Sequence, residues 1–575
     1  MPPRSRIPQG QKQHSVSKSS QDSIVAVQKN LGTGFALHQQ GKLDEAQFYY
    51  EKVLKADAKN FDALHLQGVI AHQRQDYGAA IELLNRAIQQ NPRNALAYLN
   101  RANTLKALGD IEQAIANYKQ AVAIHPEYAE AYVNLGIALQ EIQQADQALS
   151  CYRKAIALKP DFAEAFFALG NALQDCGQTE AAVLSLQEAT RLRPGFAAAY
   201  CNLGSLFKEL GRFDDAVAVF AEAIRAQSDF AVAHCNLGNV QKEMQQFRMA
   251  IASYSRATAL NPDFAEAHWN RSLVHLLLGE FEAAWPLFEW RWKAKKNNIS
   301  LPDFRRPLWL GEPALSGKTI LICWEQGFGD TIQFCRYASH VQALGAKVLL
   351  VVPPSLVPLL KTLDGADQVL GPDEPISDFD YYCPLMSLPL AFHTTLRTIP
   401  APKAYLHADE GKSNFWAAKL PRTGRKRVGI AWRGSTTNKS RSVPLEELIR
   451  HLPKHLDYVC LQKDVTDQER DILSDANMYC FEQDIADFSD TAALCGLMDM
   501  VISIDTSAAH LAGALGKQTW VLLPHLPDWR WLLERTDCPW YPSMRLYRQD
   551  DMGAWGPVLQ RVVQELSELF PPSAD

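Results

Sequence analysis

The chain has 575 residues, of which 47% are hydrophobic and 21% are charged, and its formal net charge at pH 7 is −6. This composition is ordinary for a globular protein, and the length exceeds what one hydrophobic core supports, so we expect several domain-sized units. The mildly acidic balance argues against the basic surface by which nucleic-acid-binding proteins are recognised.

The N-terminal segment, residues 1–26, is polar and rich in Ser and Gln. It lacks the apolar stretch of a signal peptide, so we expect a disordered tail. No run of apolar residues is long enough for a transmembrane helix. Eleven cysteines without any C-x2-C pair argue against a zinc site and suit free thiols in a reducing compartment. We therefore expect a soluble, cytoplasmic protein.

From about residue 27 to residue 298 the sequence repeats every 34 residues. Small residues that let two helices cross recur at this spacing from Ala46 to Ala284. Such a period predicts stacked helix pairs, and with its Gly, Ala and Pro pattern it resembles the tetratricopeptide repeat. We expect about eight repeats over residues 27–298, forming a superhelix with a long concave face. The prolines of the repeat, with Ser228 in the one gap, are Pro92, Pro126, Pro160, Pro194 and Pro262.

An asparagine occupies the sixth place of most repeats, although Asn is a poor residue for a helix interior. Its amide offers a donor and an acceptor, as a peptide group does, so a row of such amides can hold an extended protein chain by its backbone. The alternative is that Asn here is generic to the repeat whatever it binds. The row, which Ala168 interrupts, consists of Asn100, Asn134, Asn202, Asn236 and Asn270.

After the repeats, a proline-rich linker is expected over residues 299–317, and the pattern then changes to buried strands alternating with helices. This alternation predicts parallel sheets covered on both faces, with a ligand at the carboxyl ends of the strands. We expect one such unit over residues 318–422 and a second, which binds the donor of a reaction, over residues 423–575. The expected strands lie in KTILICWE, AKVLLVVP, DFDYYCPL, RKRVGIAWRG, DYVCLQ, MDMVISIDTS and QTWVLLP.

A glycine turn follows the first of these strands and precedes a helix expected from about Thr331. Gly327 and Gly329 suit a turn that passes close to a ligand, and Asp330 stands at the mouth of the helix. Two interpretations of Asp330 stay open. It is either the N-cap of the helix, or a carboxylate that takes a proton from an incoming hydroxyl group.

A basic loop over residues 432–442 also follows a buried strand. It brings Arg433, Lys439 and Arg441 together among Ser and Thr hydroxyls. Charged loops are usually solvated surface, but one at the carboxyl end of a strand suits the neutralisation of a diphosphate leaving group.

The stretch VISIDTSAAHLAGALG, residues 501–516, is a buried strand that ends in polar groups and continues as a helix of small residues. The free N–H groups at the start of a helix bind anions, so Asp505, Thr506, Ser507 and His510 mark an expected phosphate-binding site, in which His510 donates to a phosphate or to a ribose hydroxyl. The alternative is an Asp or Thr N-cap beside a surface histidine. Farther on, an aromatic segment rich in Trp and Arg, residues 524–549, is expected to pack rather than to stack on a ligand.

Four motifs carry a family resemblance, namely G-F-G-D, W-R-G-S, D-T-S-x-x-H-L-A and P-D-W-R-W. On them, residues 318–570 resemble the heptosyltransferase-like, family 9 glycosyltransferases, which have the GT-B fold of two facing Rossmann-like units. With the repeats in front, the chain resembles bacterial repeat-containing glycosyltransferases, including flagellin glycosyltransferases. Its layout is similar to that of O-linked N-acetylglucosamine transferase, whose repeats carry an asparagine ladder over the acceptor protein.

The resemblance implies inversion at the sugar carbon, a nucleotide-sugar donor and no metal or other cofactor. The acidic base of the family falls on Asp330. The D-[TS]-x-x-x-H nucleotide-binding element falls on Asp505, Thr506 and His510, while Ser507 stands where the family commonly has Gly. The basic loop residues fall only loosely on Arg433, Lys439 and Arg441.

The expected function is that of a cytoplasmic protein O-glycosyltransferase. The repeats would hold the acceptor protein, and a Ser or Thr hydroxyl of that protein would attack the donor sugar. Resemblance implies flagellin as an acceptor and a nonulosonic acid, such as pseudaminic or legionaminic acid, as the sugar. Two alternatives stay open: a scaffold whose transferase half is inactive, and a transferase that acts on a lipid or oligosaccharide.

Overall fold

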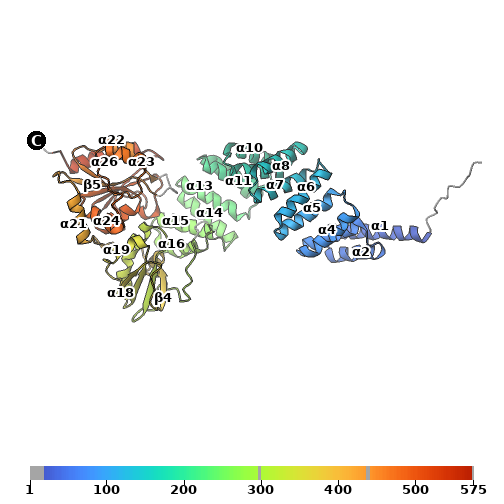
Figure 1. Cartoon of the computed structure of the whole chain (residues 1–575), viewed down its shortest axis with the longest axis horizontal. Coiled ribbons are helices and arrows are strands. Elements are labelled where there is room, and N and C mark those ends of the chain that lie inside the picture. Colours follow the sequence, from blue (N-terminus) through green and yellow to red (C-terminus); the bar gives the residue numbers. More distant parts are fainter. Residues whose placement is uncertain (1–17, 296–298, 435–440, 573–575) are drawn as a thin grey trace, which may run out of the picture. The chain divides into compact units, whose positions relative to one another are not determined.

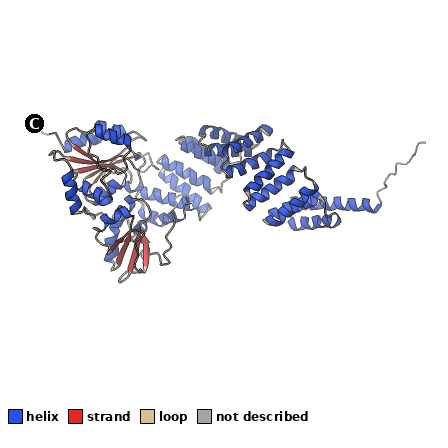
Figure 2. Ribbon diagram, viewed as in Figure 1, coloured by secondary structure: helices blue, strands red, loops and turns tan. Residues whose placement is uncertain are grey.

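The computed structural model of the chain describes residues 18–295, 299–434 and 441–572. The chain forms two compact units, residues 1–230 and residues 231–575 (Figure 1). The first unit is entirely helical where it is described, whereas the second combines helices with two β-sheets (Figure 2).

The first unit consists of six helix pairs, in which each odd-numbered helix packs against the even-numbered helix that follows it. Helix α1 begins at Lys18, so the expectation of a disordered tail up to residue 26 is wrong for residues 18–26. The helices are α1 (Lys18–Gln39), α2 (Leu43–Ala56), α3 (Phe61–Gln73), α4 (Tyr77–Gln90), α5 (Ala95–Leu108), α6 (Ile111–Ile124), α7 (Ala129–Glu141), α8 (Ala145–Leu158), α9 (Ala163–Asp175), α10 (Thr179–Leu192), α11 (Ala197–Glu209) and α12 (Phe213–Ala226).

Small residues of the repeat stand where two helices of a pair cross. At Gly136 of α7, an added Cβ atom would lie 2.5 Å from Cε1 of Tyr152 in α8, a distance that no side chain tolerates. The repeated alanines, such as Ala114 and Ala148, are fully buried at equivalent crossings. The 34-residue period therefore arises from the close approach of neighbouring helices.

The second unit begins with two further helix pairs of the same kind, so the described residues contain eight pairs in all. This number is the one that the sequence period predicts. The helices are α13 (Ala231–Glu243), α14 (Phe247–Leu260), α15 (Ala265–Leu277) and α16 (Phe281–Phe288), and a short 3-10 helix, η1 (Glu289–Trp292), follows.

A parallel sheet of four strands, in the order β3-β2-β1-β4, comes next. The segment expected as a linker packs on this sheet, because Leu308 pairs with Tyr382 of β4 and Trp309 is buried. The elements are β1 (Thr319–Cys323), α17 (Phe328–Phe334), α18 (Ala338–Ala343), β2 (Lys347–Val351), α19 (Val357–Leu360), β3 (Gln368–Leu370), β4 (Tyr381–Pro384) and α20 (Leu388–Ala391).

A second parallel sheet, of five strands, has the order β6-β5-β7-β8-β9. Numbered within the sheet, this is 2-1-3-4-5, an order in which ligands bind where the chain switches direction between the first and third strands. The elements are α21 (Glu410–Lys419), β5 (Arg427–Ala431), α22 (Leu445–His451), β6 (Asp457–Cys460), α23 (Asp467–Asp475), α24 (Phe488–Gly496), β7 (Met500–Ile504), α25 (Ser507–Ala514), β8 (Thr519–Leu523), η7 (Trp529–Trp531), β9 (Met544–Arg548) and α26 (Trp555–Leu569).

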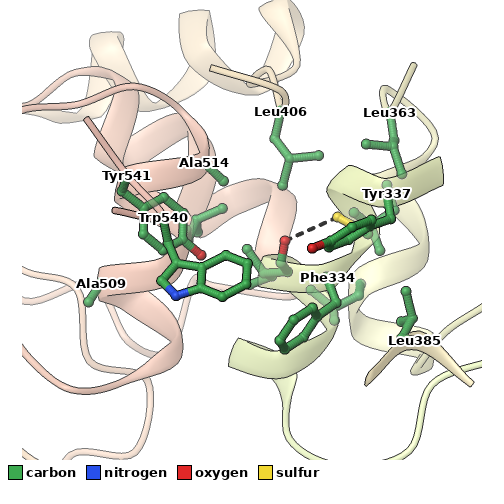
Figure 3. Packing of buried hydrophobic residues seen from close by; sticks show 14 of the residues in the cluster. Phe334, Tyr337, Leu363, Leu385, Leu406, Ala509, Ala514, Trp540 and Tyr541 are labelled. Atoms are coloured by element: carbon green, nitrogen blue, oxygen red, sulfur yellow. Dashed lines mark hydrogen bonds between the residues drawn. The ribbon is translucent and has the colours of Figure 1, made fainter. Parts of the chain in front are cut away.

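One hydrophobic core joins the last helix pair to both sheets. In its centre the rings of Phe334 and Trp540 lie edge to face with centroids 5.6 Å apart, and Tyr337 and Tyr541 flank them (Figure 3). Trp529, Trp531 and Trp540 are all buried. The aromatic segment after β8 therefore packs, as the sequence predicts.

A buried arginine fastens the repeats to the first sheet. Arg291 of η1 is 1% exposed and donates to both carboxylate oxygens of Glu325, at 2.8 and 3.1 Å, just after β1. It also donates to Glu289 at 2.6 Å and to Ser387, which follows β4, at 2.7 Å. Since all these groups are buried or partly buried, the network is fixed only while every member is present.

We predict that Arg291→Met destabilises residues 231–575 by about 3–5 kcal/mol, because it leaves the buried carboxylates of Glu325 and Glu289 without a cation. All thirteen tryptophans lie at Trp269 or beyond it. Tryptophan fluorescence during urea denaturation of the full chain therefore reports the unfolding of this unit.

The matched control is Arg248→Met, which removes an exposed cation that pairs with Glu280. Exposed pairs contribute little, so we expect a loss below about 1 kcal/mol. Equal effects of the two substitutions would show that the buried network does not hold the repeats to the sheet.

Candidate functional site

A cavity of about 1130 Å³ lies at the carboxyl ends of the strands of both sheets. Its size exceeds that of most sites for small ligands, and its position is where parallel sheets bind them. The lining residues that follow strands are Gly327, Gly329 and Asp330 after β1, Met386 after β4, Arg433 and Gly434 after β5, Gln462 and Lys463 after β6, and Asp505, Thr506, Ser507 and His510 after β7.

The last repeats form another wall of the same cavity. Lys242 of α13 and Trp269, Leu273 and Leu277 of α15 line it. The indole nitrogen of Trp269 is buried and has no hydrogen-bond partner among the described residues. The sequence pattern did not reveal this wall, because these positions are ordinary members of the repeat.

Asp330 lies within the first turn of α17, which begins at Phe328 and therefore earlier than expected. Gly327 is the N-cap of this helix, so the interpretation of Asp330 as an N-cap is wrong. An oxygen of Asp330 accepts a hydrogen bond of 2.5 Å from Arg530. Burial raises the pKa of Asp330, and the positive charge of Arg530 opposes that shift.

Arg530 binds several of the polar side chains in this part of the cavity. Besides Asp330, its guanidinium donates to Asp528 at 2.8 Å and to Gln333 at 2.7 Å. Asp330 follows a strand of the four-stranded sheet and Asp528 follows a strand of the five-stranded sheet, so one arginine binds a carboxylate from each. Asp528 and Arg530 belong to the P-D-W-R-W motif, but the aromatic segment that contains them is expected from the sequence to pack, so neither residue is predicted to bind a catalytic carboxylate.

The start of α25 faces the cavity with uncapped N–H groups. Thr506 is the N-cap residue, but its hydroxyl lies 3.1 Å from that of Ser503 and 3.4 Å from the carbonyl oxygen of Ile504, and it caps no N–H group. Among the described residues, the N–H groups of residues 507–509 have no acceptor. Such a turn is suited to an anion. Burial raises the pKa of Asp505, at the end of β7, to about 6.

His510 is buried, so the alternative of a surface histidine is wrong. Its Nδ1 atom lies 2.9 Å from the hydroxyl of Tyr541, and its ring stacks on Trp531 with centroids 5.3 Å apart. Burial, reinforced by Arg530 and other cations, lowers the pKa of His510 well below its usual value. A Cβ atom added at Gly329 would lie 2.8 Å from this ring. The sequence predicts that Gly329 lets the turn pass close to a ligand. In the structure, the absence of a side chain at Gly329 makes room for the ring of His510.

The basic loop differs from the expectation. Both ends of the Arg433 guanidinium bind Glu469 of α23, at 3.0 and 3.1 Å, so Arg433 is not a free cation for a leaving group. Arg441 lies 3.6 Å from Asp505, and its buried Nε atom has no partner among the described residues. Lys439 lies outside the described residues.

The asparagine row is partly linked by hydrogen bonds between repeats. Asn134, Asn202 and Asn270 each donate to the asparagine 31 residues before them, at 3.3, 2.7 and 3.0 Å. Asn100 lies 2.8 Å from the Nε2 atom of His65. Each linked amide still has its oxygen and one N–H free of this bond, so it retains the donor and the acceptor that a peptide backbone requires. The row, with Asn236, lies on partly exposed positions.

Within the described ranges, no three His, Cys, Asp or Glu side chains form a group that could hold a metal ion. All eleven cysteines have free thiols. No described helix combines the length and the apolar character that crossing a bilayer requires.

Comparison with known families identifies the repeats. The family described as TPR repeat matches residues 102–143, 141–177, 170–211 and 204–245, and the tetratricopeptide repeat family matches residues 231–264. Residues 39–121 match the family of anaphase-promoting complex, cyclosome, subunit 3. The N-terminal part of the chain is therefore a TPR-type α-solenoid, and the prediction of this fold is confirmed.

Protein FlbA of Caulobacter vibrioides is 26% identical over 329 residues, which cover 52% of this chain and 54% of that protein. The chain thus spans about half the length of this curated relative. Among solved structures, YrrB, a TPR protein with an unusual peptide-binding site, is 26% identical; the match covers 32% of this chain and 95% of YrrB with a TM-score of 0.28. For MamA the identity is 29%, the coverage 28% and 93%, and the TM-score 0.26.

We predict that Asp505→Asn changes the pH dependence of stability. Because the pKa of Asp505 is about 6 in the folded state and about 3.9 in an unfolded chain, the native protein binds more protons between pH 4 and pH 6. The contribution of Asp505 to the free energy of unfolding therefore falls as the pH rises. Relative to the wild type, Asp505→Asn should gain about 2–3 kcal/mol between pH 4 and pH 7, measured by tryptophan fluorescence in urea.

Asp537→Asn is a control that should change the pH dependence of stability in the opposite direction. Arg535 lowers the pKa of this carboxyl group, so its contribution is present at neutral pH and is lost as the pH falls. The control should therefore lose stability relative to the wild type as the pH rises to about 5, where the unfolded chain is deprotonated, and show a constant difference above that pH. A constant difference between wild type and Asp505→Asn across this range would contradict the raised pKa.

Proposed function

We propose that this chain is an inverting, metal-independent protein O-glycosyltransferase with a GT-B arrangement of two Rossmann-like units. It transfers a sugar from a nucleotide-activated donor to a Ser or Thr hydroxyl of a protein held by the TPR array. One observation carries the proposal: the carboxyl ends of both parallel sheets and the helices α13 and α15 of the last repeats line the same cavity. A scaffold with an inert second half does not need a cavity shared in this way.

In this proposal, groups that follow the strands of the second sheet bind the nucleotide sugar. The free N–H groups at the start of α25 bind the phosphate that is attached to the sugar, an interaction worth up to about 2 kcal/mol for a partly buried anion. Arg441, whose Nε atom has no partner among the described residues, adds a cation beside them. Together these groups stabilise the negative charge that the nucleotide gains as the glycosidic bond breaks.

Asp330 supplies the base. The acceptor hydroxyl oxygen forms a bond to the anomeric carbon, the bond from that carbon to the phosphate oxygen breaks with its electron pair, and the hydroxyl proton passes to Asp330. Burial favours this role because it raises the pKa of Asp330 toward neutral pH. Arg530 holds the carboxylate in place and keeps it ionised before the transfer.

The repeats bind the acceptor protein. The asparagine row offers amide groups that pair with an extended backbone, and the array ends at Trp269, Leu273 and Leu277 in the cavity wall. The family resemblance makes flagellin and a nonulosonic acid such as pseudaminic or legionaminic acid the acceptor and sugar to test first. If the acceptor were a lipid, the repeats, which are suited to binding a protein chain, would not need to line the cavity.

We predict that intact-mass spectrometry will find a sugar-sized mass increase on an acceptor protein co-expressed with the chain. Asp330→Asn should reduce the transfer rate by a factor of about 10²–10⁴, the usual contribution of a general base, while the heat of donor binding stays unchanged. Asp528→Asn is the matched control, because Asp528 also pairs with Arg530, and it should lose less than about tenfold. Undiminished transfer by Asp330→Asn would remove Asp330 from the role of base.

We also predict that the double substitution Asn202→Ala, Asn236→Ala weakens acceptor binding about thirtyfold, since each loses a hydrogen-bonding amide worth about 1 kcal/mol. The donor affinity should not change. Asn91→Ala, in the exposed loop after α4, is the control. Surface plasmon resonance with the acceptor identified by mass spectrometry measures the effect, and equal affinities of all three proteins would exclude the row from acceptor binding.

A further inference from the structure

The segment that carries Arg530 has an unfavourable backbone conformation. This segment, residues 529–536, begins with the short helix η7 and is called the arginine loop below. Leu532 has a φ of 54° and a ψ of −165°, and Glu534 has a φ of 53°. Both φ angles lie in the left-handed region, which residues with a side chain rarely adopt. Contacts from outside the arginine loop are therefore needed to hold it in this conformation.

Arg548, the last residue of β9, makes such contacts. Its Nη2 atom donates to the carbonyl oxygen of Trp531 at 2.7 Å, and its Nε atom donates to that of Arg535 at 3.1 Å. These two carbonyl groups flank the left-handed residues, one directly before Leu532 and the other directly after Glu534. A planar guanidinium can bind both at once, because its N–H groups point in fixed directions.

The guanidinium of Arg548 has no other task among the described residues. No carboxylate pairs with it, and its Nη1 atom is buried without a hydrogen-bond partner. Burial lowers the pKa of Arg548 to about 10. A cation removed from water without a counter-ion destabilises the fold unless hydrogen bonds compensate. The two carbonyl groups of the arginine loop provide that compensation, so Arg548 and the loop hold each other in place.

The conformation of the arginine loop determines where the side chain of Arg530 lies. Trp531 follows Arg530 directly, so fixing its carbonyl group fixes the backbone on that side of Arg530. On the other side, the carboxylate of Asp528 accepts from the backbone N–H of Arg530 at 3.1 Å. With both sides fixed, the guanidinium of Arg530 reaches Gln333 and Asp330 of α17. A change of backbone conformation at Leu532 would move it away from them.

We propose that Arg548 is a positioning residue: by binding the carbonyl groups of Trp531 and Arg535, it holds the arginine loop in the conformation that places Arg530 on Asp330. Arg548 does not itself line the cavity, so it acts through Arg530. Its effect on the reaction rests on the proposed function, in which Asp330 is the base. Its effect on the loop does not.

The effect on the loop is measured without any ligand, by amide hydrogen exchange and mass spectrometry of the full chain. In Arg548→Met the loop loses both hydrogen bonds and should open more often. The N–H groups of Trp531 and Leu532, which donate to carbonyl groups of residues 528 and 529, should then exchange about tenfold faster than in the wild type. Exchange at the wild-type rate in a folded Arg548→Met protein would overturn the proposal.

Arg545→Met is the matched control. Arg545 lies on the same strand, β9, but it is exposed and pairs with Glu565 at 2.6 Å. Losing a cation from this strand should therefore leave exchange in the arginine loop at the wild-type rate. Faster exchange in this control, equal to that in Arg548→Met, would show that the loop responds to any change in β9 and not to the bonds from Arg548.

Arg548→Lys keeps the proposal testable if Arg548→Met does not fold. Lysine retains the charge, but its single nitrogen cannot reproduce the two-nitrogen contact of the guanidinium with both carbonyl groups. With one of the two hydrogen bonds lost, exchange in the arginine loop should be about threefold faster than in the wild type. Unchanged exchange in Arg548→Lys would show that binding both carbonyl groups is not what holds the loop.

The pH profile of sugar transfer tests the connection to the base. Arg530, Asp528 and Arg441 are the charged groups that influence Asp330, and the ring of His510 packs beside it at Gly329. Transfer needs the ionised carboxylate, so the rate should rise with pH through the pKa of Asp330. Without Arg530 in place that pKa rises further, because the nearest positive charge is lost.

The midpoint of the profile should therefore move to higher pH in Arg548→Met, by up to about 1 unit, and stay in place in Arg545→Met. A merely structural role of Arg548 would lower the rate equally at every pH. Faster exchange with an unmoved midpoint would overturn the connection to Asp330. If the wild type transfers no sugar to any protein, the proposed function fails, while hydrogen exchange still decides whether Arg548 holds the arginine loop.

Discussion

The packing of helix α17 against helix α25 is the constraint on which the site depends. Each helix follows an inner strand of its own parallel sheet, so their contact brings the carboxyl ends of β1 and β7 to one cavity. The contact is close because Gly329 lies against the ring of His510, where a side chain would collide. One turn farther along α25, a Cβ atom at Gly513 would lie 2.4 Å from Met544 and 2.6 Å from Tyr541. Close packing therefore requires a small residue at this position of α25.

The same closeness explains the electrostatics of the site. Burial raises the pKa of Asp330 and of Asp505, and the negative charge of the third carboxylate, Asp528, adds to both shifts. Arg530 offsets this cost through bonds to two of the three, and Arg441 lies beside the third. Asp330 and Asp505 thus combine a raised pKa with a defined position, the two properties that proton transfer near neutral pH needs.

The last two helix pairs, α13 to α16, belong to the same compact unit as the two sheets. Arg291 binds residues at the carboxyl ends of β1 and β4, and α15 lines the cavity. A protein chain bound along the last repeats would therefore reach the cavity without leaving the surface of this unit. Repeats that only attached the chain to a partner would not need to line the cavity, whereas repeats that present an acceptor protein to it would.

The regular parts of the chain were predictable from the sequence, and the exceptions have physical causes. The 34-residue period and the buried apolar strands follow from local patterns, and the polar groups after β1 and β7 do mark the cavity. β3 has three residues, and β9 alternates apolar side chains with arginines, so neither shows the apolar run of a buried strand. The engagement of Arg433 by Glu469, 36 residues away, and the bridge from Arg530 to Asp330, 200 residues away, depend on tertiary contacts that no local pattern contains.

The most direct test of the account is a crystal structure of the full chain with a bound nucleotide-sugar donor. We predict that the oxygens of the phosphate attached to the sugar accept hydrogen bonds from the N–H groups of residues 507–509, with the anomeric carbon on the side of Asp330. A donor whose phosphate lies elsewhere on the chain, with the first turn of α25 touching no part of it, would contradict the assignment of this cavity as the transferase site.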